Sequence, residues 1–459
     1  MKKLNRLFAL SLAMLMCVCL VFATSCKGNG DDTSSDAPIS SEQGDYQKLD
    51  YEVFDMGGDT INILGFYSIF STGDTANTER GVLTIERRKE LETLYNVNFN
   101  MEVLAQQYIV SSEIDAAHMA GDVRADLFCC FANGMKGLAN AGEVYPISDV
   151  IDITRPQWND AVTEVSMKDG KAYFISPDPI NIESLVTFKP KYLDTYGIEN
   201  PYDLIKEGKW TTDKYVEIAE KITQLGASSG VYGHNAITTE PSLSHVLGLF
   251  GTEWVTQDED GFYHSNLDDP KIIDALNWLV RLNKTAPPKT EGDAVNVFAF
   301  PANNTGMGNV SVSDPAREKE KYFCEAPLSQ HTTEPPNLAQ QANVRGMQSL
   351  LSEERAKQVG TIYSYYCEPL GGSEEEQDRI TKAEWDARVY NPESAETILK
   401  YIERGATMHK WTFSGGGYGT IDKAITPAIE NETGFASVLA SIKPTLESIL
   451  DEKNKELDR

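Results

Sequence analysis

Two strand-like patterns near the start of the chain enclose a stretch with the pattern of a helix. Residues 60–64, TINIL, alternate apolar and polar side chains, and residues 96–104, NVNFNMEVL, do the same. Between them, a charged stretch has an apolar face made of Leu91, Leu94 and Tyr95. A strand, a helix and a second strand in this order form the unit of a parallel sheet. The sequence therefore predicts an α/β fold.

Further strands and helices are expected along the rest of the chain. Residues 125–131, ADLFCCF, are typical of a buried strand that a helix follows, and residues 170–176, GKAYFIS, of another strand. The run at 371–378, GGSEEEQD, is expected to be a solvated loop. With 459 residues, the chain is long enough for two lobes with sizeable cores. Helices are expected over Trp210–Thr223 with Thr212 as its cap, Pro270–Asn283, Glu353–Tyr366, Pro392–Arg404, Asp422–Asn431 and Phe435–Lys453.

The N-terminus has the three parts of a secretory signal. Lys2, Lys3 and Arg6 precede an apolar run over residues 7–22, and small residues then lead to Cys26. Small residues before a cysteine resemble the lipobox at which bacterial lipoproteins are cleaved and acylated. We therefore expect a signal over residues 1–25 and lipidation at Cys26; a plain secretory signal is the alternative.

The segment that follows Cys26 is expected to be a flexible tether. Residues 27–47 are rich in Ser, Gly and Asp and have almost no large apolar side chain, so they cannot bury enough surface to offset the entropy of ordering. With residues up to 57, this tether would hold a folded domain near a membrane through the lipid alone.

The charge of the chain excludes several kinds of partner. The formal net charge is −28, and loss of the signal with its three basic residues would bring it to −28 − 3 = −31. Such a chain is a poor ligand for nucleic acid or for anionic lipid. Of the seven cysteines, four remain after the signal and Cys26 are set aside, and their spacing predicts buried thiols without a metal or a disulfide.

Three short segments resemble catalytic or ion-binding motifs, but none of them fits its motif in full. GASSG at 226–230 matches G-x-S-x-G, but it follows a helix and precedes a strand, the reverse of the order that a hydrolase needs. GGGYG at 415–419 lacks the lysine of a phosphate loop, and DEDG at 258–261 does not complete a calcium loop and favours a hairpin turn. We expect no catalysis, no cofactor and no metal.

Ordered sequence blocks along the chain resemble one family. They are ADLFCCFANGMKGLANAGEVYPISDV at 125–150, MKDGKAYFISPDP at 167–179, YLDTYGIENPYDLIKEGKWTTDKYVEIAEKIT at 192–223, FPANNTGMGNV at 300–310 and NPESAETILKYIERG at 391–405. In the fourth block, Asn303 and Gly306 replace the usual glycine and alanine. In this order the blocks resemble the extracellular solute-binding lipoproteins, family 1, of bacterial ABC importers.

The resemblance implies a periplasmic-binding-protein-like fold of two α/β lobes joined by a multi-segment hinge. Lobe 1 would hold residues 58–177 plus 346–386, and lobe 2 would hold residues 183–342 plus 391–459. A ligand would bind in the cleft between the lobes, and closure of the cleft would be recognised by the permease.

Candidate ligand residues lie where strands are expected to end, because open α/β sheets bind ligands at the carboxyl ends of their strands. Aromatic rings stack on sugar rings, and Asp, Asn or Trp N–H groups bond sugar hydroxyls. The resemblance places Asn133 at a position that bonds sugar hydroxyls, and Asn133 and Trp411 are our first choices. The candidates are Phe66, Tyr67, Phe131, Asn133, Asp178, Asn181, Asn235, Trp254, Asn309, Trp411 and Tyr418.

Each candidate has a simpler alternative. Phe66, Phe131 and Trp254 are also suited to a core, and Asp178 and Asn235 to turns. The sequence as a whole favours a monomeric, extracytoplasmic, lipid-anchored receptor for a small carbohydrate, with ABC permease subunits as partners. A surface lipoprotein enzyme acting on carbohydrate, or a receptor for a peptide, polyamine or iron, remains the alternative.

Overall fold

The computed structural model describes the chain from Tyr51 onward, with gaps. The residues described are 51–69, 78–178, 183–259, 261–289, 294–301, 322–339, 341–389, 391–414 and 418–457. They belong to a compact unit, Tyr51–Arg459. The expected signal, Cys26 and most of the expected tether lie outside the described residues. None of the helices described is long and apolar enough to cross a membrane.

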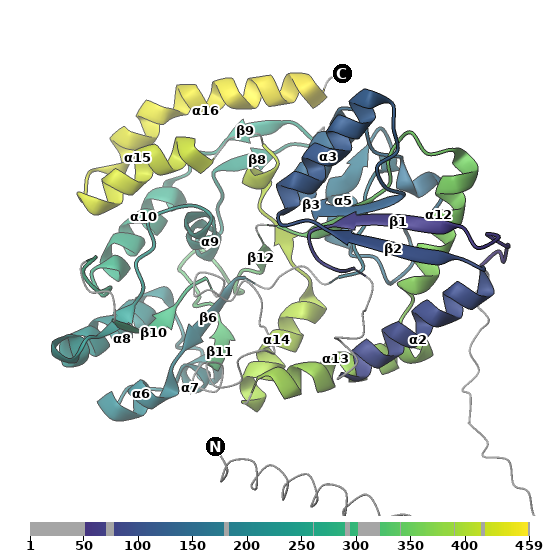
Figure 1. Cartoon of the computed structure of the whole chain (residues 1–459). Helices are drawn as coiled ribbons and strands as arrows, with labels where there is room; N and C mark the ends of the chain where they lie inside the picture. The colour runs from purple at the N-terminus through teal and green to yellow at the C-terminus, as the bar shows by residue number, and fades with distance from the viewer. Residues whose placement is uncertain are drawn as a thin grey trace, which may run out of the picture. The chain divides into compact units, whose positions relative to one another are not determined.

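The first sheet confirms the strand–helix–strand prediction. Strands β1 (Thr60–Gly65), β2 (Asn98–Val103) and β3 (Leu127–Phe131) are parallel, and β13 (Asn343–Gly346) runs antiparallel beside β3. The order across the sheet is β13-β3-β1-β2. Figure 1 shows β1 and β2 side by side, although helix α2 (Glu79–Leu94) separates them in the sequence. This sheet and its helices form lobe 1.

Alternating side chains cover both faces of this sheet, because successive strand residues point to opposite sides. Ile63 and Leu127 pack in one cluster with Leu91 of α2 and with α12 (Glu353–Tyr366). Leu64 and its neighbours pack in another cluster with α3 (Gln107–Ala120) and α4 (Ala132–Asn140). Of the expected inner face of α2, Leu91 and Tyr95 are buried, but Leu94 is 39% exposed, so the prediction for Leu94 was wrong.

The second sheet defines lobe 2 and has the order β11-β6-β10-β7. Strand β10 (Val295–Ala299) is parallel to β7 (Val231–His234) and antiparallel to β6 (Leu185–Phe188), and β11 (Tyr322–Glu325) is antiparallel to β6. The helices of this part of the chain are α6 (Pro190–Tyr196), α7 (Pro201–Lys206), α8 (Thr212–Gly226), α9 (Ser242–Leu249), α10 (Pro270–Asn283), α14 (Pro392–Arg404), α15 (Tyr418–Glu430) and α16 (Phe435–Leu457).

The chain passes between the two sheets more than once. It leaves lobe 1 after Ile175, which bridges to Arg345, and it enters the second sheet at β6. It returns directly from β12 (Leu338–Ala339) to β13. Strand β12 pairs with β14 (Thr407–Met408) from the last part of the chain.

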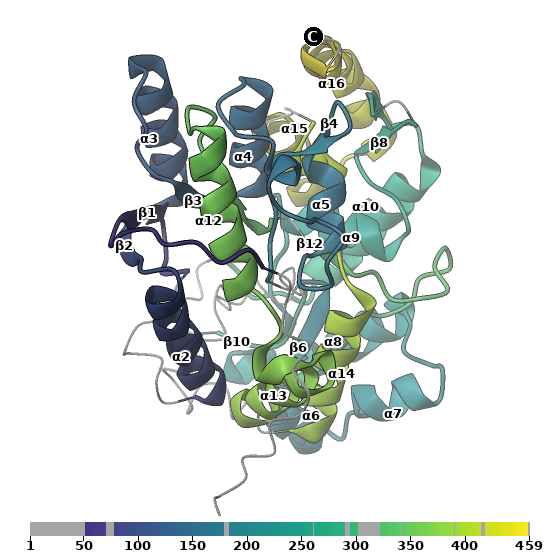
Figure 2. The same cartoon turned by 90° about the vertical axis from the view of Figure 1, so that its right-hand side faces the viewer.

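Local capping corrects two expectations from the sequence. Helix α8 begins at Thr212, and its cap is Thr211, whose side chain accepts a hydrogen bond from the Lys214 N–H. The expected loop at 371–378 instead contains the start of α13 (Glu374–Arg388), which lies beside α14 in Figure 2. Ser373 caps α13, and glutamates in its first turn favour the positive end of the helix dipole. The cap at Ser373 and the glutamates in the first turn therefore stabilise a helix in the acidic run that was expected to be a loop.

The expected strand at 170–176 is short. Only β5 (Lys171–Ala172) is a strand there, paired with β4 (Met167–Lys168), and Ile175 forms an isolated bridge. The DEDG run was correctly expected at a hairpin turn, between β8 (Val255–Gln257) and β9 (Tyr263–Ser265). Helix α8 ends at the GASSG run, as expected. The thiols of Cys129, Cys130, Cys324 and Cys367 are free, and only Cys367 is partly exposed.

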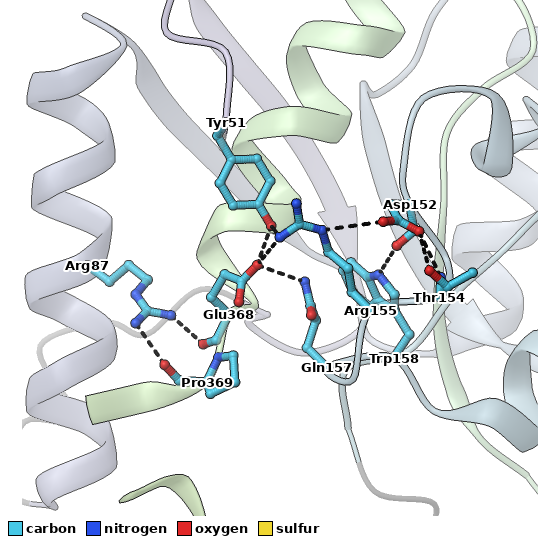
Figure 3. A network of polar contacts seen from close by, with 9 residues as sticks. All are labelled: Tyr51, Arg87, Asp152, Thr154, Arg155, Gln157, Trp158, Glu368 and Pro369. Carbon is cyan, nitrogen blue, oxygen red and sulfur yellow. Dashed lines mark hydrogen bonds and ion pairs between the residues drawn. The ribbon is translucent and has the colours of Figure 1, made fainter. Parts of the chain in front are cut away.

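A polar network holds the first described residue against lobe 1. Figure 3 shows Glu368, just after α12, accepting hydrogen bonds from the Tyr51 hydroxyl, from Arg155 (2.7 Å) and from Gln157 (3.3 Å). The Arg155 guanidinium also lies 4.6 Å from the centre of the Tyr51 ring. Arg87 of α2 donates to the backbone oxygens of Glu368 and Pro369. The chain therefore enters lobe 1 at a fixed point.

Candidate functional site

Three aromatic residues meet at the carboxyl ends of β1 and β3. The ring centre of Phe66 lies 4.9 Å from that of Tyr67 and 5.3 Å from that of Phe131, both at steep angles. All three side chains are partly exposed. The structure therefore brings together the aromatic residues that were predicted after these two strands, and it leaves part of each ring free.

A buried arginine completes this edge of lobe 1. Arg345 of β13 is 3% exposed, and its guanidinium forms an ion pair with Asp178 (2.6 Å) and donates to the Tyr67 hydroxyl (2.8 Å). It also donates to Ser176 (3.2 Å) and to the backbone oxygen of Asn343 (3.0 Å). The Asp178 side chain stays 46% exposed. The Asp178 carboxyl group is thus fixed in place by Arg345 while part of it stays exposed.

Burial keeps the Tyr67 hydroxyl protonated. Desolvation raises the pKa of Tyr67 far above its ordinary value, and the nearby Arg345 charge lowers it by less. The hydroxyl can therefore accept from Arg345 while it donates to Asp178, whose Oδ2 lies 3.3 Å away. Arg345 was missed in the sequence, although a basic residue among apolar neighbours at an expected crossing is a usable signal.

Asn133 lies close by, but in a helix and not in the expected loop. It belongs to the first turn of α4, directly after β3, and its side chain is exposed. Its Oδ1 accepts a hydrogen bond from the Gly134 N–H (2.8 Å). The backbone N–H of Ala132 donates to Ala342, which brings the second crossing of the chain against this helix start (3.0 Å).

Trp254 is held inside lobe 2. It is 0% exposed, and its indole N–H donates to Glu240, which also accepts from Ser244 (2.7 Å). Burial raises the pKa of Glu240 to about 7, because its hydrogen-bond donors are neutral and only partly offset desolvation. The described contacts of Trp254 are those of a core residue.

The other described candidates of lobe 2 have unpartnered atoms. Trp411, in the short helix η6 (Lys410–Thr412), is 2% exposed, and its Nε1 has no hydrogen-bond partner among the described residues. Asn235 follows β7 and is partly exposed, and its buried Oδ1 likewise lacks a partner within the described part of the chain. Asn181 and Asn309 lie outside the described residues. Tyr418 begins α15, but its side chain is not described.

The described contacts at the edge of lobe 1 are of kinds that can bind a polar ligand. No group of three or more His, Cys, Asp or Glu residues within the described ranges is arranged to hold a metal ion. At the lobe 1 edge, a fixed carboxylate and a phenol lie beside partly free aromatic faces. Such groups can bond hydroxyls and cover C–H surfaces.

Solved structures share the fold of this chain. A cyclic α-maltosyl-1,6-maltose binding protein from Arthrobacter globiformis has a TM-score of 0.62 at 14% identity, over 86% of this chain and 99% of its own. UgpB from Mycobacterium tuberculosis, solved with glycerophosphocholine, has a TM-score of 0.59 at 14% identity, over 86% of this chain and 99% of its own.

A third structure extends the comparison. The ABC transporter associated binding protein of B. animalis subsp. lactis, solved with β-1,6-galactobiose, has a TM-score of 0.56 at 15% identity, over 86% of this chain and 98% of its own. No protein-family model and no curated protein sequence matches the chain. The likeness confirms the predicted fold class, a two-lobe α/β fold of the kind seen in solute-binding proteins.

Proposed function

We propose that this chain is the substrate-binding component of an ABC importer, and that it captures a sugar or oligosaccharide between its lobes. The observation that carries the proposal is a fold shared over 86% of the chain with a cyclic α-maltosyl-1,6-maltose binding protein and with an ABC transporter associated binding protein solved with β-1,6-galactobiose. Under this proposal the chain binds and releases its ligand unchanged, and ABC permease subunits receive it.

The edge of lobe 1 supports a carbohydrate as the ligand. Phe66, Tyr67 and Phe131 offer aromatic faces, and Asp178 offers a carboxylate that Arg345 holds in place. Sugar rings present C–H faces and hydroxyl edges, which match these two kinds of group. Asn133, Asn181, Asn235, Asn309, Trp411 and Tyr418 stay as further candidate ligand residues, whereas the contacts of Trp254 favour its alternative as a core residue.

A thermal-shift screen of the full chain against a library of sugars and polyols tests the proposal. A ligand that binds only the folded state raises the melting temperature by mass action. We expect at least one sugar to do so and to be recovered chemically unchanged. A shift with peptides or polyamines alone would point to the non-sugar receptor, and recovery of cleaved sugar would point to an enzyme.

Lobe closure gives a second test of the same proposal. A receptor with two lobes joined by a hinge is expected to close on its ligand. Small-angle scattering should show a smaller radius of gyration when the sugar found by the screen is bound. A variant with Asp178 replaced by alanine, which removes a predicted ligand contact, is expected to show a smaller change at the same sugar concentration.

The lipid anchor is part of the proposal and has a test of its own. We propose that Cys26 is acylated and that the protein stays outside the cytoplasm on the membrane, held by the lipid at the start of the tether predicted over residues 26–57. In cells fed labelled fatty acid, Cys26→Ala should carry no label, while Cys367→Ala should label like the wild type. Label retained on Cys26→Ala would contradict lipidation at this residue.

A further inference from the structure

Three buried side chains beside the β12–β14 pair carry polar atoms without a hydrogen-bond partner in the described structure. These atoms are both ring nitrogens of His409, the Nε1 of Trp411 and the Oε1 of Gln341. The residues are 2%, 2% and 9% exposed, respectively. Buried polar groups in folded proteins are nearly always bonded, because leaving one unbonded costs stability. A group of such residues therefore requires a partner.

The pairing of β12 with β14 places all three residues near the end of this strand pair. The backbone N–H of His409 donates to the Ala339 oxygen (3.0 Å) at the end of this pair. Gln341 follows Ala339 by two positions, where the chain turns toward lobe 1, and Trp411 follows His409 by two positions. We call Gln341, His409 and Trp411 the β12–β14 polar group.

A second histidine shows that the fold can satisfy a buried imidazole at this place. The ring of His245 lies 4.8 Å from that of His409, edge to face. Its Nδ1 is 3.2 Å from the Ser184 hydroxyl, and its Nε2 is 3.1 Å from Glu183. His245 thus has a protein partner at each nitrogen, whereas His409 has none among the described residues. The difference indicates that the partner of His409 lies outside the described residues.

The donors and acceptors of the β12–β14 polar group indicate what kind of partner these residues need. Burial lowers the pKa of His409 well below its ordinary value, so its ring is neutral and has one donor and one acceptor. Trp411 adds a donor, and the Gln341 oxygen adds an acceptor. Donors and acceptors without charge match hydroxyl groups, which donate and accept at the same atom. A carboxylate offers acceptors only, and an ammonium group offers donors only.

We infer that Gln341, His409 and Trp411 form a hydroxyl-binding subsite for an uncharged polyhydroxy ligand, with Trp411 acting through its indole N–H. This inference rests on the proposed function and deepens it, because it selects neutral sugars and polyols over charged solutes. It also assigns ligand contacts to Gln341 and His409.

Single variants of the full chain test the subsite. His409→Leu, Trp411→Phe and Gln341→Leu each remove the polar atoms while keeping an apolar side chain of moderate size. Calorimetric titrations would use D-mannitol, maltose and β-1,6-galactobiose. For whichever of these the wild type binds, each variant should bind about tenfold more weakly, the factor that corresponds to one buried hydrogen bond. Melting temperatures without sugar should be equal or higher in His409→Leu and Gln341→Leu, because no hydrogen bond among the described residues is lost. In Trp411→Phe the smaller buried ring should lower the melting temperature slightly.

His245→Leu is the matched control. It removes two hydrogen bonds within the chain, to Ser184 and to Glu183, so its melting temperature should fall. If the wild type binds a sugar and the three variants bind it equally well, the subsite is overturned and the proposed function stands. A melting temperature that falls in His409→Leu as far as in His245→Leu, with unchanged affinity, would assign the atoms to buried water and also overturn the subsite. If the wild type binds none of the sugars, the proposed function fails and the subsite fails with it.

Discussion

The two lobes differ in the hydrogen-bond partners of three buried polar residues, Arg345 in lobe 1 and Glu240 and His409 in lobe 2. In lobe 1, the charge of Arg345 is met by Asp178, Tyr67 and Ser176, all from the same lobe or its first crossing. In lobe 2, Glu240 is bonded by neutral donors only, and His409 has no described partner at either nitrogen. The charge of Arg345 at the edge of lobe 1 is therefore paired before a ligand arrives, although its Nε has no partner among the described residues, whereas both ring nitrogens of His409 in lobe 2 lack a described partner. A receptor built in this way would bind its ligand first to lobe 1.

The strongest test of this difference is the loss of the Arg345 charge. Arg345→Met should lower the free energy of unfolding by about 3 kcal/mol, the low end for breaking a buried ion pair, because Asp178 stays partly solvated. Urea denaturation followed by circular dichroism measures the change. Arg281→Met is the control, since Arg281 forms a pair with Asp213 at the surface and should cost less than about 0.5 kcal/mol. Equal losses in the two variants would mean that lobe 1 is not held together by its buried charge.

The pH dependence of stability should come in part from Glu240. Its pKa is about 7 in the folded chain and 4.5 when unperturbed, so the folded state holds this proton over a range where the unfolded state has released it. The stabilisation from this proton is complete below about pH 4.5 and is lost as the pH rises through 7. We expect the free energy of unfolding to fall by about 2 kcal/mol between about pH 5 and pH 7 from this group.

Replacement of the carboxyl isolates this contribution. Glu240→Gln should remove that part of the slope, and urea denaturation at a series of pH values measures it. Glu217→Gln changes a carboxyl that is 67% exposed and should leave the slope as in the wild type. An unchanged slope in Glu240→Gln would show that the buried carboxyl of lobe 2 is not protonated in this range.

Two tryptophans of lobe 2 allow a matched comparison, because the indole N–H of one has a hydrogen-bond partner and that of the other has none among the described residues. Trp254→Phe removes the N–H that donates to Glu240, whereas Trp411→Phe removes an N–H without a described partner. Both changes shrink a buried ring by a similar volume. Trp254→Phe should therefore be the more destabilising by about 1 kcal/mol, the contribution of one buried hydrogen bond. Denaturation of both variants at one pH gives the difference, and a larger loss in Trp411→Phe would reverse the assignment.

Local patterns in the sequence predicted much of the fold. Helices α10, α12 and α14 have the bounds that were expected, and the structure shows a capping side chain before each of them, Asp269, Ser352 and Asn391. The aromatic group at Phe66 and Phe131 was also predicted, because the carboxyl ends of parallel strands meet at one edge of a sheet. Helix α13 was missed, since the acidic run was interpreted by its charge and not by the cap at Ser373.

The polar chemistry of the site depends on contacts that no local pattern contains. Arg345 and Asp178 lie far apart in the sequence, and their ion pair exists only because the crossing segments run side by side. His245 and His409 look alike as single residues in the sequence, yet one is bonded at both nitrogens and the other at neither within the described residues. Tertiary packing decides which buried polar groups find hydrogen-bond partners. The atoms without a described partner could therefore be identified only in the structure.

The smallest effect is expected at Asn133, on the exposed start of α4. Its side chain bonds only the adjacent Gly134 N–H among the contacts described, so its amide is available to a hydroxyl. Asn133→Ala should weaken sugar binding by about 1 kcal/mol and change the free energy of unfolding by less than about 0.5 kcal/mol. Asn431→Ala, at an exposed position beyond α15, is the control and should change neither quantity much. Calorimetry and melting curves on the same samples measure both. A clear loss of stability without a loss of affinity would make Asn133 a helix-start residue alone, and recognition by lobe 1 would then depend on Asp178, Tyr67 and the aromatic faces beside them.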